Sequence, residues 1–305
     1  MKTLLRTARL LRVGNLALVA ITPPALWSAL VKPLLATPQL TQHHLVLLGL
    51  ALAAVTGAGN VVNDIADRTI DRLNGRPNPL LEGLPVGVAW GLFGLLTLTG
   101  AILTWQLAAE LDRWAWAPLL PLTLLTLVGY AYALKCQPWV GNLVVSVLCA
   151  GVPALIFVAE PALRDSFPHS PLAQTLAAYV VFAFFGTWTR ELVKDLEDRS
   201  GDAAAGCRTL AVAWPRERVI AVAWASLFFL LSAIAYLAAV WYLSNALTNA
   251  LCWAGLWLLV AAIGRSMSLA REPRAYAQVS RHLKLAMGFG LFLVILVAIS
   301  QWRSF

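Results

Sequence analysis

The chain has 305 residues, of which 60% are hydrophobic and 12% are charged, and its mean hydropathy is +0.73. Soluble domains carry about 25% charged residues, so this composition excludes a water-soluble globule, and its hydrophobicity excludes a disordered chain. Four cysteines in so long a chain also exclude a disulfide scaffold. We therefore expect an all-α polytopic membrane protein, because a segment within lipid must satisfy its own backbone hydrogen bonds.

Nine hydrophobic runs have the length that crosses a bilayer as a helix, about 18–25 residues, and lack interior charge. They cover residues 13–31, 44–63, 84–108, 114–134, 139–159, 172–189, 219–241, 246–264 and 283–301. The first run follows a basic stretch similar to the start of a signal peptide. Pro23 and Pro24 interrupt this run and no clear cleavage site follows, so we expect a retained helix. We expect one domain over residues 1–305.

The basic residues predict the orientation. With the N-terminus in the cytoplasm, 19 of the 23 Lys and Arg residues fall on the cytoplasmic side of the nine runs. Cytoplasmic loops are enriched in these residues, so the bias supports this orientation in the inner membrane. It also explains the net charge of +8 without a nucleic-acid partner. Most of the 13 Trp residues should lie where the membrane meets water, in contact with lipid.

Ten of the 15 acidic residues lie in two segments predicted to be cytoplasmic, residues 64–82 and 191–217. In the first segment, Asn63, Asp67 and Asp71 are spaced four apart, so a continuing helix would place them on one face, with Asp64 on the flank. Like charges at this spacing destabilise a helix slightly. A shared divalent cation would make the same spacing favourable.

The second segment repeats the pattern. Glu191, Asp195, Asp198 and Asp202 recur with a period near 3.6 residues, which is one helical stripe. Both stripes follow the cytoplasmic end of a predicted span. Oxygen ligands without His or Cys suit Mg²⁺, and Mg²⁺ beside Lys and Arg suits a diphosphate. Helices rich in Trp, Phe and Leu would hold the hydrocarbon tail of such a diphosphate. If the tail is an allylic prenyl group, loss of the diphosphate leaves an allylic carbocation, which aromatic faces would stabilise.

At these residues the sequence resembles the UbiA superfamily of intramembrane prenyltransferases. The motif NxxxDxxxD is matched by Asn63, Asp67 and Asp71, and DxxxD by Asp198 and Asp202. The resemblance covers nearly the whole chain. It implies two Mg²⁺ ions that bridge a prenyl diphosphate between the two motifs, and a central cavity that opens to membrane lipids.

Residues 190–210 resemble the geranylgeranylglycerol-phosphate geranylgeranyltransferase branch of that superfamily, as do residues 12–16 and 132–142. The branch implies a geranylgeranyl donor and a lipophilic acceptor, a glycerol-phosphate lipid. Ile65 and Ala66 stand where many relatives have an aromatic residue. This difference leaves the metal ligands intact but affects what the resemblance implies about the acceptor pocket.

The complete predicted site has four groups of residues. They are the catalytic residues Asp67, Asp71, Asp198 and Asp202; the metal ligands Asn63, Asp64, Asp67, Asp71, Glu191, Asp195, Asp198 and Asp202; the diphosphate contacts Arg72, Arg76, Lys135, Lys194 and Arg208; and the acceptor contacts Asn15 and Asn142.

The sequence also bears on three alternatives to this function. An aromatic quinone precursor, of the 4-hydroxybenzoate or dihydroxynaphthoate type, is the alternative acceptor. An ion transporter is disfavoured because the acidic residues lie at helix ends and not at the membrane midplane. A CDP-alcohol phosphotransferase would need an Asp-Gly pair, which the chain lacks. The sequence leaves the oligomeric state open.

Two further expectations concern cysteines and a loop. The chain has no CxxC pair, so we expect Cys136, Cys149, Cys207 and Cys252 to be reduced and mostly buried, without a zinc site. The stretch Ala203–Gly206 should be a flexible loop that closes on substrate.

Overall fold

Every regular element in the described part of the chain is helical. The structure is a computed structural model, and it describes residues 2–32, 35, 37–167, 169–241 and 246–302. Within these residues, nine helices are long and apolar enough to span a membrane. The all-α membrane architecture predicted from the sequence is confirmed. The cytoplasmic position of the N-terminus stays a prediction.

The chain divides into two units, which we describe separately. Unit 1 comprises Met1–Pro24, Gln39–Gly141 and Ser200–Arg208, and unit 2 comprises Ala25–Pro38, Asn142–Arg199 and Thr209–Phe305. The single domain expected over residues 1–305 stays a prediction.

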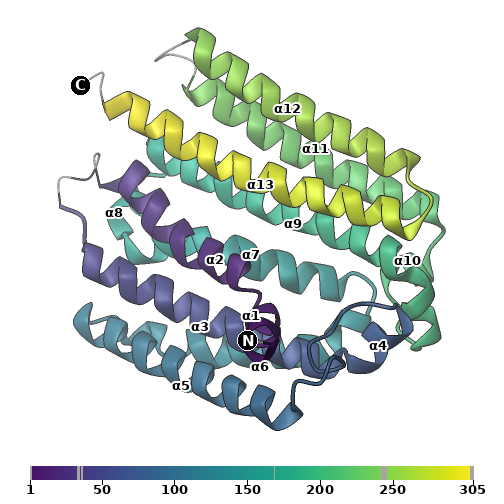
Figure 1. Ribbon diagram of the computed structural model, residues 1–305. Helices are drawn as coiled ribbons and strands as arrows, with labels where there is room; N and C mark the ends of the chain where they lie inside the picture. Colours follow the sequence, from purple (N-terminus) through teal and green to yellow (C-terminus); the bar gives the residue numbers. More distant parts are fainter. Residues whose placement is uncertain (1, 33–34, 36, 168, 242–245, 303–305) are drawn as a thin grey trace. The chain divides into compact units, whose positions relative to one another are not determined.

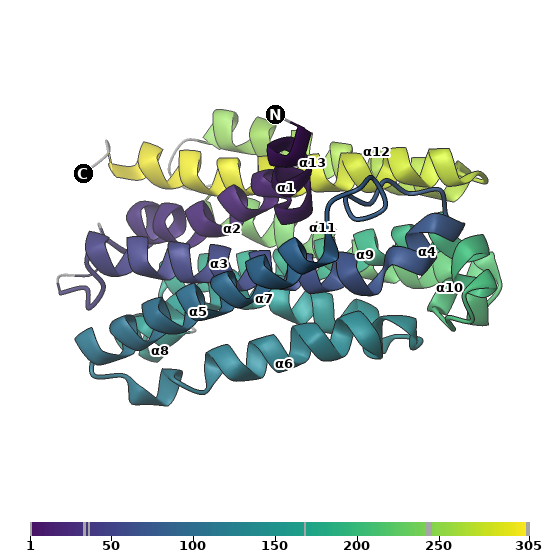
Figure 2. The same ribbon diagram turned by 60° about the horizontal axis from the view of Figure 1, so that its bottom comes forward.

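Unit 1 is built around one central helix, α3. Its elements are α1 (Lys2–Leu11), most of α2 (Val13–Leu26), α3 (Gln42–Ala66), α4 (Arg68–Leu73), α5 (Val86–Glu110), the short 3-10 turn η2 (Trp114–Trp116), α6 (Leu119–Tyr132) and the 3-10 turn η3 (Leu134–Cys136). Helix α3 packs along α5 and α6 (Figures 1 and 2).

The sequence of α3 explains its start and its close packing. The Thr41 hydroxyl accepts a hydrogen bond from the His44 N–H, and the His44 ring accepts one from the Thr41 N–H, which is a capping box. A Cβ on Gly49 would lie 2.6 Å from the Ala20 carbonyl oxygen. Small residues allow membrane helices to approach each other this closely. Gly49 therefore allows α3 and α2 to pack closely within unit 1.

Unit 2 holds the remaining long helices. Its elements are the π-helical turn η1 (Trp27–Val31), most of α7 (Val140–Ala159), α8 (Pro161–Asp165), most of α9 (Pro171–Ala204), α10 (Leu210–Ala213), α11 (Arg216–Trp241), α12 (Ala246–Leu269) and α13 (Pro273–Trp302). Helix α12 packs against α11 and α13 (Figure 1). The Thr189 hydroxyl donates to Ser226 Oγ at 2.8 Å, which joins α9 to α11.

Helix α9 extends beyond the predicted membrane span and includes the whole second motif. The span was expected to end at residue 189, and the helix continues to Ala204, so the second motif is helical as its periodicity predicted. Arg190, Lys194 and the Asn142 amide partner its carboxylates, as described below, and reduce their mutual repulsion. One expectation is wrong: Ala203 and Ala204 are helical, and only the two residues that follow them in the expected loop lie outside the helix.

The expectation of four reduced cysteines is wrong. Cys136 and Cys207 form a disulfide between positions 71 residues apart, and Cys149 is exposed. The sequence spacing carries no sign of this pair, because the fold brings the two segments together.

Candidate functional site

The first motif keeps helical spacing across a break. Helix α3 ends at Ala66 and α4 begins at Arg68, with Asp67 between them. The Asp67 N–H still donates to the Asn63 carbonyl at 2.8 Å, and the Asp71 N–H donates to the Asp67 carbonyl at 2.8 Å. Asn63, Asp67 and Asp71 therefore follow one another at intervals of one helical turn, as the sequence predicted. The Asn63 amide also donates to Asp67 Oδ2.

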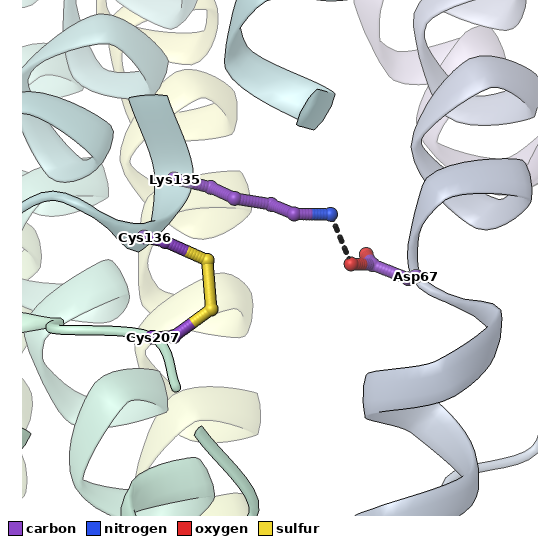
Figure 3. Close-up of a disulfide and its surroundings, with 4 residues drawn as sticks. All are labelled: Asp67, Lys135, Cys136 and Cys207. Carbon is purple, nitrogen blue, oxygen red and sulfur yellow. Dashed lines mark hydrogen bonds and ion pairs between the residues drawn. A yellow bond between two sulfur atoms is a disulfide. The ribbon is translucent and has the colours of Figure 1, made fainter. Parts of the chain in front are cut away.

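Two cations pair with the carboxylates of this motif. Lys135 Nζ forms an ion pair with Asp67 Oδ1, from the turn η3 across to the end of α3 (Figure 3). Arg12 Nη2 donates to Asp64 Oδ1 at 2.6 Å, and the Asp64 side chain is 9% exposed. Lys135 is one of the predicted diphosphate contacts. Arg12 begins the segment 12–16 that resembles the family branch but has no predicted site role, and the structure adds it to the first motif.

Arg12 reaches Asp64 from an unusual backbone conformation. Its φ is +54°, in the left-handed region, where a residue with a side chain costs about 1–2 kcal/mol. The residue lies between α1 and α2, and the neighbouring Leu11 carbonyl accepts a hydrogen bond from the Asn60 amide at 3.0 Å. Strained residues persist where their surroundings hold them, and such positions cluster at functional sites. This conformation brings a guanidinium to the first motif.

A buried amide joins the two halves of the first motif. Asn78 is 1% exposed, and its Nδ2 donates to the Asp64 carbonyl at 2.9 Å and to Asp71 Oδ2 at 2.8 Å. Its Oδ1 accepts from the Leu80 N–H at 2.9 Å. Asn78 therefore fixes α4 against the end of α3 and holds one oxygen of Asp71. This role could not be predicted from the sequence, because Asn78 lies outside both motifs.

The charge on Asp71 is costly without a cation. Burial raises the pKa of Asp71 above its ordinary value, while the hydrogen bond from Asn78 acts in the opposite direction. Asp67, a second carboxylate nearby, raises the pKa of Asp71 further. A bound cation would favour the charged form of this carboxyl group.

We expect Asn78→Ala to raise the Mg²⁺ concentration needed for half-maximal activity by about 10- to 100-fold, the usual cost of losing a group that orients a metal ligand. The variant frees the Asp71 oxygen that Asn78 holds. Activity measured against Mg²⁺ concentration tests this. Tyr276→Phe is the matched control, because the buried Tyr276 hydroxyl also donates to a backbone carbonyl but touches no motif carboxylate. An equal shift in both variants would contradict the role of Asn78.

The carboxylates of the second motif in unit 2 also have partners. Glu191 is 6% exposed and pairs with Arg190 at 3.0 Å and Lys194 at 2.8 Å. The Asn142 amide on α7 donates to Asp195 Oδ2 at 3.0 Å. Lys194, a predicted diphosphate contact, and Asn142, a predicted acceptor contact, thus both lie at this motif.

The last residue of the second motif lies in unit 1, together with the first motif. Asp202 is buried, and the preceding Gly201 faces Asn74, the residue that ends α4. A Cβ on Gly201 would overlap the Asn74 side-chain amide. The end of α9 is therefore in van der Waals contact with the end of the helix that carries Asp71.

Gly201→Ala should force these two helix ends apart. We expect a loss of prenyl-transfer activity of at least about tenfold, because displacements near 1 Å in an active site have effects of this size or larger. Gly255→Ala is the matched control, since a Cβ on that helical glycine meets nothing within 4 Å. Initial rates of both purified variants test the prediction, and unchanged activity in Gly201→Ala would contradict it.

The other predicted diphosphate and acceptor contacts are exposed or half-buried, and three of them make backbone hydrogen bonds. Arg72 is exposed on α4, and the half-buried Arg76 donates its backbone N–H to the Asp71 carbonyl at 2.8 Å. Arg208 is exposed, and its backbone N–H donates to the Cys136 carbonyl at 3.0 Å. The half-buried Asn15 donates its backbone N–H to the Arg12 carbonyl at 2.7 Å. The acceptor role of Asn15 stays a prediction.

The first motif fits a hard cation. Asn63 Oδ1 is buried without a hydrogen-bond partner, an arrangement that is costly unless a ligand takes that oxygen. It adjoins Asp67, and amide and carboxylate oxygens are ligands that Mg²⁺ accepts. Within the described residues, no three His, Cys, Asp or Glu side chains gather closely enough to hold a metal ion. Lys135 and Arg12 occupy carboxylate oxygens there, so an ion would have to displace these cations.

An apolar groove runs along α9 in unit 2. It has a volume of about 440 Å³ and lies between α7 and α9. Its lining includes Val147, Ala150, Gly151, Ala154, Val180, Val181, Phe184 and Phe185. Phe184 precedes Glu191 by seven residues, which is about 10 Å along a helix. The groove therefore approaches the second motif along the same helix.

Comparisons with known proteins agree with this architecture. The model of a family described as the UbiA prenyltransferase family matches residues 21–300. A digeranylgeranylglyceryl phosphate synthase of Natronomonas pharaonis is 31% identical over 283 residues, which cover 89% of this chain and 91% of the relative. The enzyme of that name from Methanoregula boonei is 32% identical over 248 residues, covering 76% of this chain and 82% of the relative.

Two solved structures are similar in fold. A digeranylgeranylglyceryl phosphate synthase structure superposes with a TM-score of 0.64 at 22% identity, covering 98% of this chain and 99% of the other. A UbiA homolog from Archaeoglobus fulgidus bound to DMAPP and Mg²⁺ superposes with a TM-score of 0.59 at 17% identity, covering 95% and 99%. At these identities the similarity establishes the fold.

Proposed function

Because the chain belongs to the UbiA prenyltransferase family, we propose that it transfers a geranylgeranyl group from its diphosphate to the hydroxyl of a glycerol-phosphate lipid, with Mg²⁺ as cofactor. The observation that carries this proposal is the first motif, where the unpartnered oxygen of Asn63 lies beside Asp67 and Lys135 pairs with that carboxylate. Oxygen ligands beside an ammonium group suit a metal-bound diphosphate.

The residues have separable roles in this chemistry. When bound, Mg²⁺ neutralises the charge that develops on the diphosphate as the C1–O bond breaks. Asn63, Asp67 and Asp71 would hold one ion, and Asp198 and Asp202 a second. Lys135 would move from Asp67 to a phosphate oxygen. The acceptor oxygen then bonds to C1, diphosphate leaves, and the hydroxyl proton passes to the released diphosphate.

The apolar groove between α7 and α9 supports the proposed donor. A prenyl tail in that groove would lie along α9 with its diphosphate near the second motif. Phe184 and Phe185 would present aromatic faces toward the allylic end, where positive charge develops. Exclusion of water there would protect the cation from hydrolysis.

Arg12 favours a phosphate-bearing acceptor over an aromatic acid. A lipid phosphate needs one more cation than an aromatic carboxylic acid, and Arg12 is a guanidinium beyond the predicted diphosphate contacts. The relatives named digeranylgeranylglyceryl phosphate synthase support the same acceptor class. We place the site on the cytoplasmic face of the inner membrane, on the basis of the Lys and Arg distribution.

The test is mass spectrometry of products formed by the purified protein in membranes with Mg²⁺ and geranylgeranyl diphosphate. The acceptors are geranylgeranylglycerol phosphate, 4-hydroxybenzoate and dihydroxynaphthoate, each supplied separately. We expect a prenylated product with the first acceptor that disappears when EDTA removes Mg²⁺. A product with an aromatic acid alone would overturn the acceptor assignment, and absence of any prenylated product would overturn the function.

A further inference from the structure

The disulfide lies directly beside two of the predicted diphosphate contacts. Lys135 precedes Cys136 in the chain, and Arg208 follows Cys207. Figure 3 shows Lys135 extending from the same turn as Cys136 toward Asp67, while the disulfide joins that turn to Cys207. One covalent bond therefore links the segments that carry both cations, and all of these residues belong to unit 1.

The bond limits the separation of the two cations. The Cα atoms of Cys136 and Cys207 are 4.5 Å apart. Each cationic residue is the direct chain neighbour of one of these cysteines. Since consecutive Cα atoms are 3.8 Å apart, the Cα atoms of Lys135 and Arg208 can be at most about 12 Å apart. Side chains as long as those of Lys and Arg can meet on one diphosphate across this distance.

The segment that carries Arg208 depends on this link. After α9 ends at Ala204, Gly206 adopts a φ of +77°, and the Cys207 N–H donates to the Asp202 carbonyl at 2.9 Å. The disulfide of Cys207 and the hydrogen bond from the Arg208 N–H to the Cys136 carbonyl both tie the segment to residues distant in sequence. A single backbone hydrogen bond contributes about 1 kcal/mol. Breaking the disulfide would leave Arg208 much freer to move.

We propose that the Cys136–Cys207 disulfide is a positioning element that holds Lys135 and Arg208 as one preformed diphosphate-binding pair. Holding a binding group in its bound geometry raises affinity because less conformational entropy is lost on binding. The same link fixes Asp202, through the Cys207 N–H, relative to the turn that reaches Asp67. The inference rests on the proposed function only in taking diphosphate as the ligand.

Reduction makes the proposal testable without a substitution. A dithiol supplies two electrons and two protons, the S–S bond becomes two thiols, and the dithiol becomes a cyclic disulfide. We expect the affinity for inorganic diphosphate with Mg²⁺ to fall by about tenfold on reduction, the scale of losing a group that orients a ligand. Affinity for geranylgeraniol, which lacks the diphosphate, should stay the same, whereas general loosening of the fold would weaken both.

The experiment measures both affinities by calorimetry on oxidised, reduced and reoxidised protein in detergent. The variant Cys136→Ser/Cys207→Ser should bind diphosphate like reduced protein and show no response to the dithiol. The matched control Cys149→Ser/Cys252→Ser removes the two cysteines outside the bond and should respond like the unsubstituted chain. Reoxidation should restore the affinity.

Two results would overturn the inference: equal diphosphate affinity in the oxidised and reduced states, or four titratable thiols in the protein unfolded without reductant. Product formation with geranylgeranyl diphosphate and acceptor is measured on the same samples. If prenyl transfer fails but reduction still lowers the diphosphate affinity, only the proposed function is rejected. If prenyl transfer succeeds but reduction leaves the diphosphate affinity unchanged, only the disulfide inference is rejected.

Discussion

Asp67→Asn should reduce prenyl transfer by at least about a thousandfold while leaving a folded membrane protein. The metal ion is worth several kcal/mol of transition-state stabilisation, and each 1.4 kcal/mol is a factor of ten in rate. Asn keeps the shape of Asp but replaces a charged metal ligand with a weak, neutral one. Initial rates at saturating Mg²⁺ and prenyl diphosphate, with circular dichroism to confirm helicity, measure the effect.

Two controls separate metal binding from the ion pair that Asp67 also makes. Lys135→Gln removes the partner of Asp67 but keeps the carboxylate, so it should raise the KM for prenyl diphosphate and retain measurable turnover. Asp165→Asn changes an exposed carboxylate whose identified partner is the adjacent Arg164, and its rate should equal that of the unsubstituted chain. Turnover in Asp67→Asn as high as in Lys135→Gln would contradict a metal role for Asp67.

Asp198→Asn, in the second motif, should also reduce prenyl transfer by at least about a thousandfold. Asp198 follows Asp195 by three residues on α9 and precedes Asp202 by one turn, so it lies on the stripe predicted to hold the second ion. Its neighbour Glu197 falls off this stripe. Glu197→Gln on the same turn of the same helix is therefore the matched control, and its rate should stay close to that of the unsubstituted chain.

The Asp198→Asn rate is read together with its dependence on Mg²⁺. Loss of one of two ions should lower the maximal rate even at high Mg²⁺, because the remaining ion neutralises only part of the diphosphate charge. A variant that regained full activity at high Mg²⁺ would indicate weakened binding of a single ion. Equal losses in Asp198→Asn and Glu197→Gln would show that the stripe has no special role.

The membrane helices could be predicted closely because their signal is local. The first span was expected at residues 13–31, and the corresponding helical stretch is Val13–Val31. Length and apolar character decide such spans, and both are properties of one continuous segment of the sequence. Beyond the sixth span, predicted to end at residue 189, α9 continues for 15 residues, and the periodicity of the second motif had predicted a helix there. There, Lys194 and Asn142 stabilise carboxylates that appeared in the sequence only as like charges.

The candidate site could be predicted where helical periodicity determines it. Asn63, Asp67 and Asp71 keep their spacing because backbone hydrogen bonds continue through the junction at Asp67. Arg12 could not be identified, since 52 residues separate it from Asp64 and tertiary packing brings them together. Asn78 could not be identified because its role depends on the path of the loop after α4, which brings its amide to Asp64 and Asp71.

The disulfide shows the same limit most clearly. Cys136 and Cys207 lie 71 residues apart without a spacing motif, and composition alone favoured free thiols. Sequence distance carries no information on whether two Cα atoms come within 4.5 Å. The fold decides that, through the path of the chain after α6 and after α9.

The central claim is that both acidic motifs bind metal for one diphosphate. The most direct test is electron paramagnetic resonance of Mn²⁺, used in place of Mg²⁺, bound to the protein with an unreactive prenyl diphosphate analogue. We predict two bound ions that require the analogue, and loss of bound Mn²⁺ in both Asp67→Asn and Asp198→Asn. Analogue-dependent binding of two ions that persists in either variant would contradict the claim.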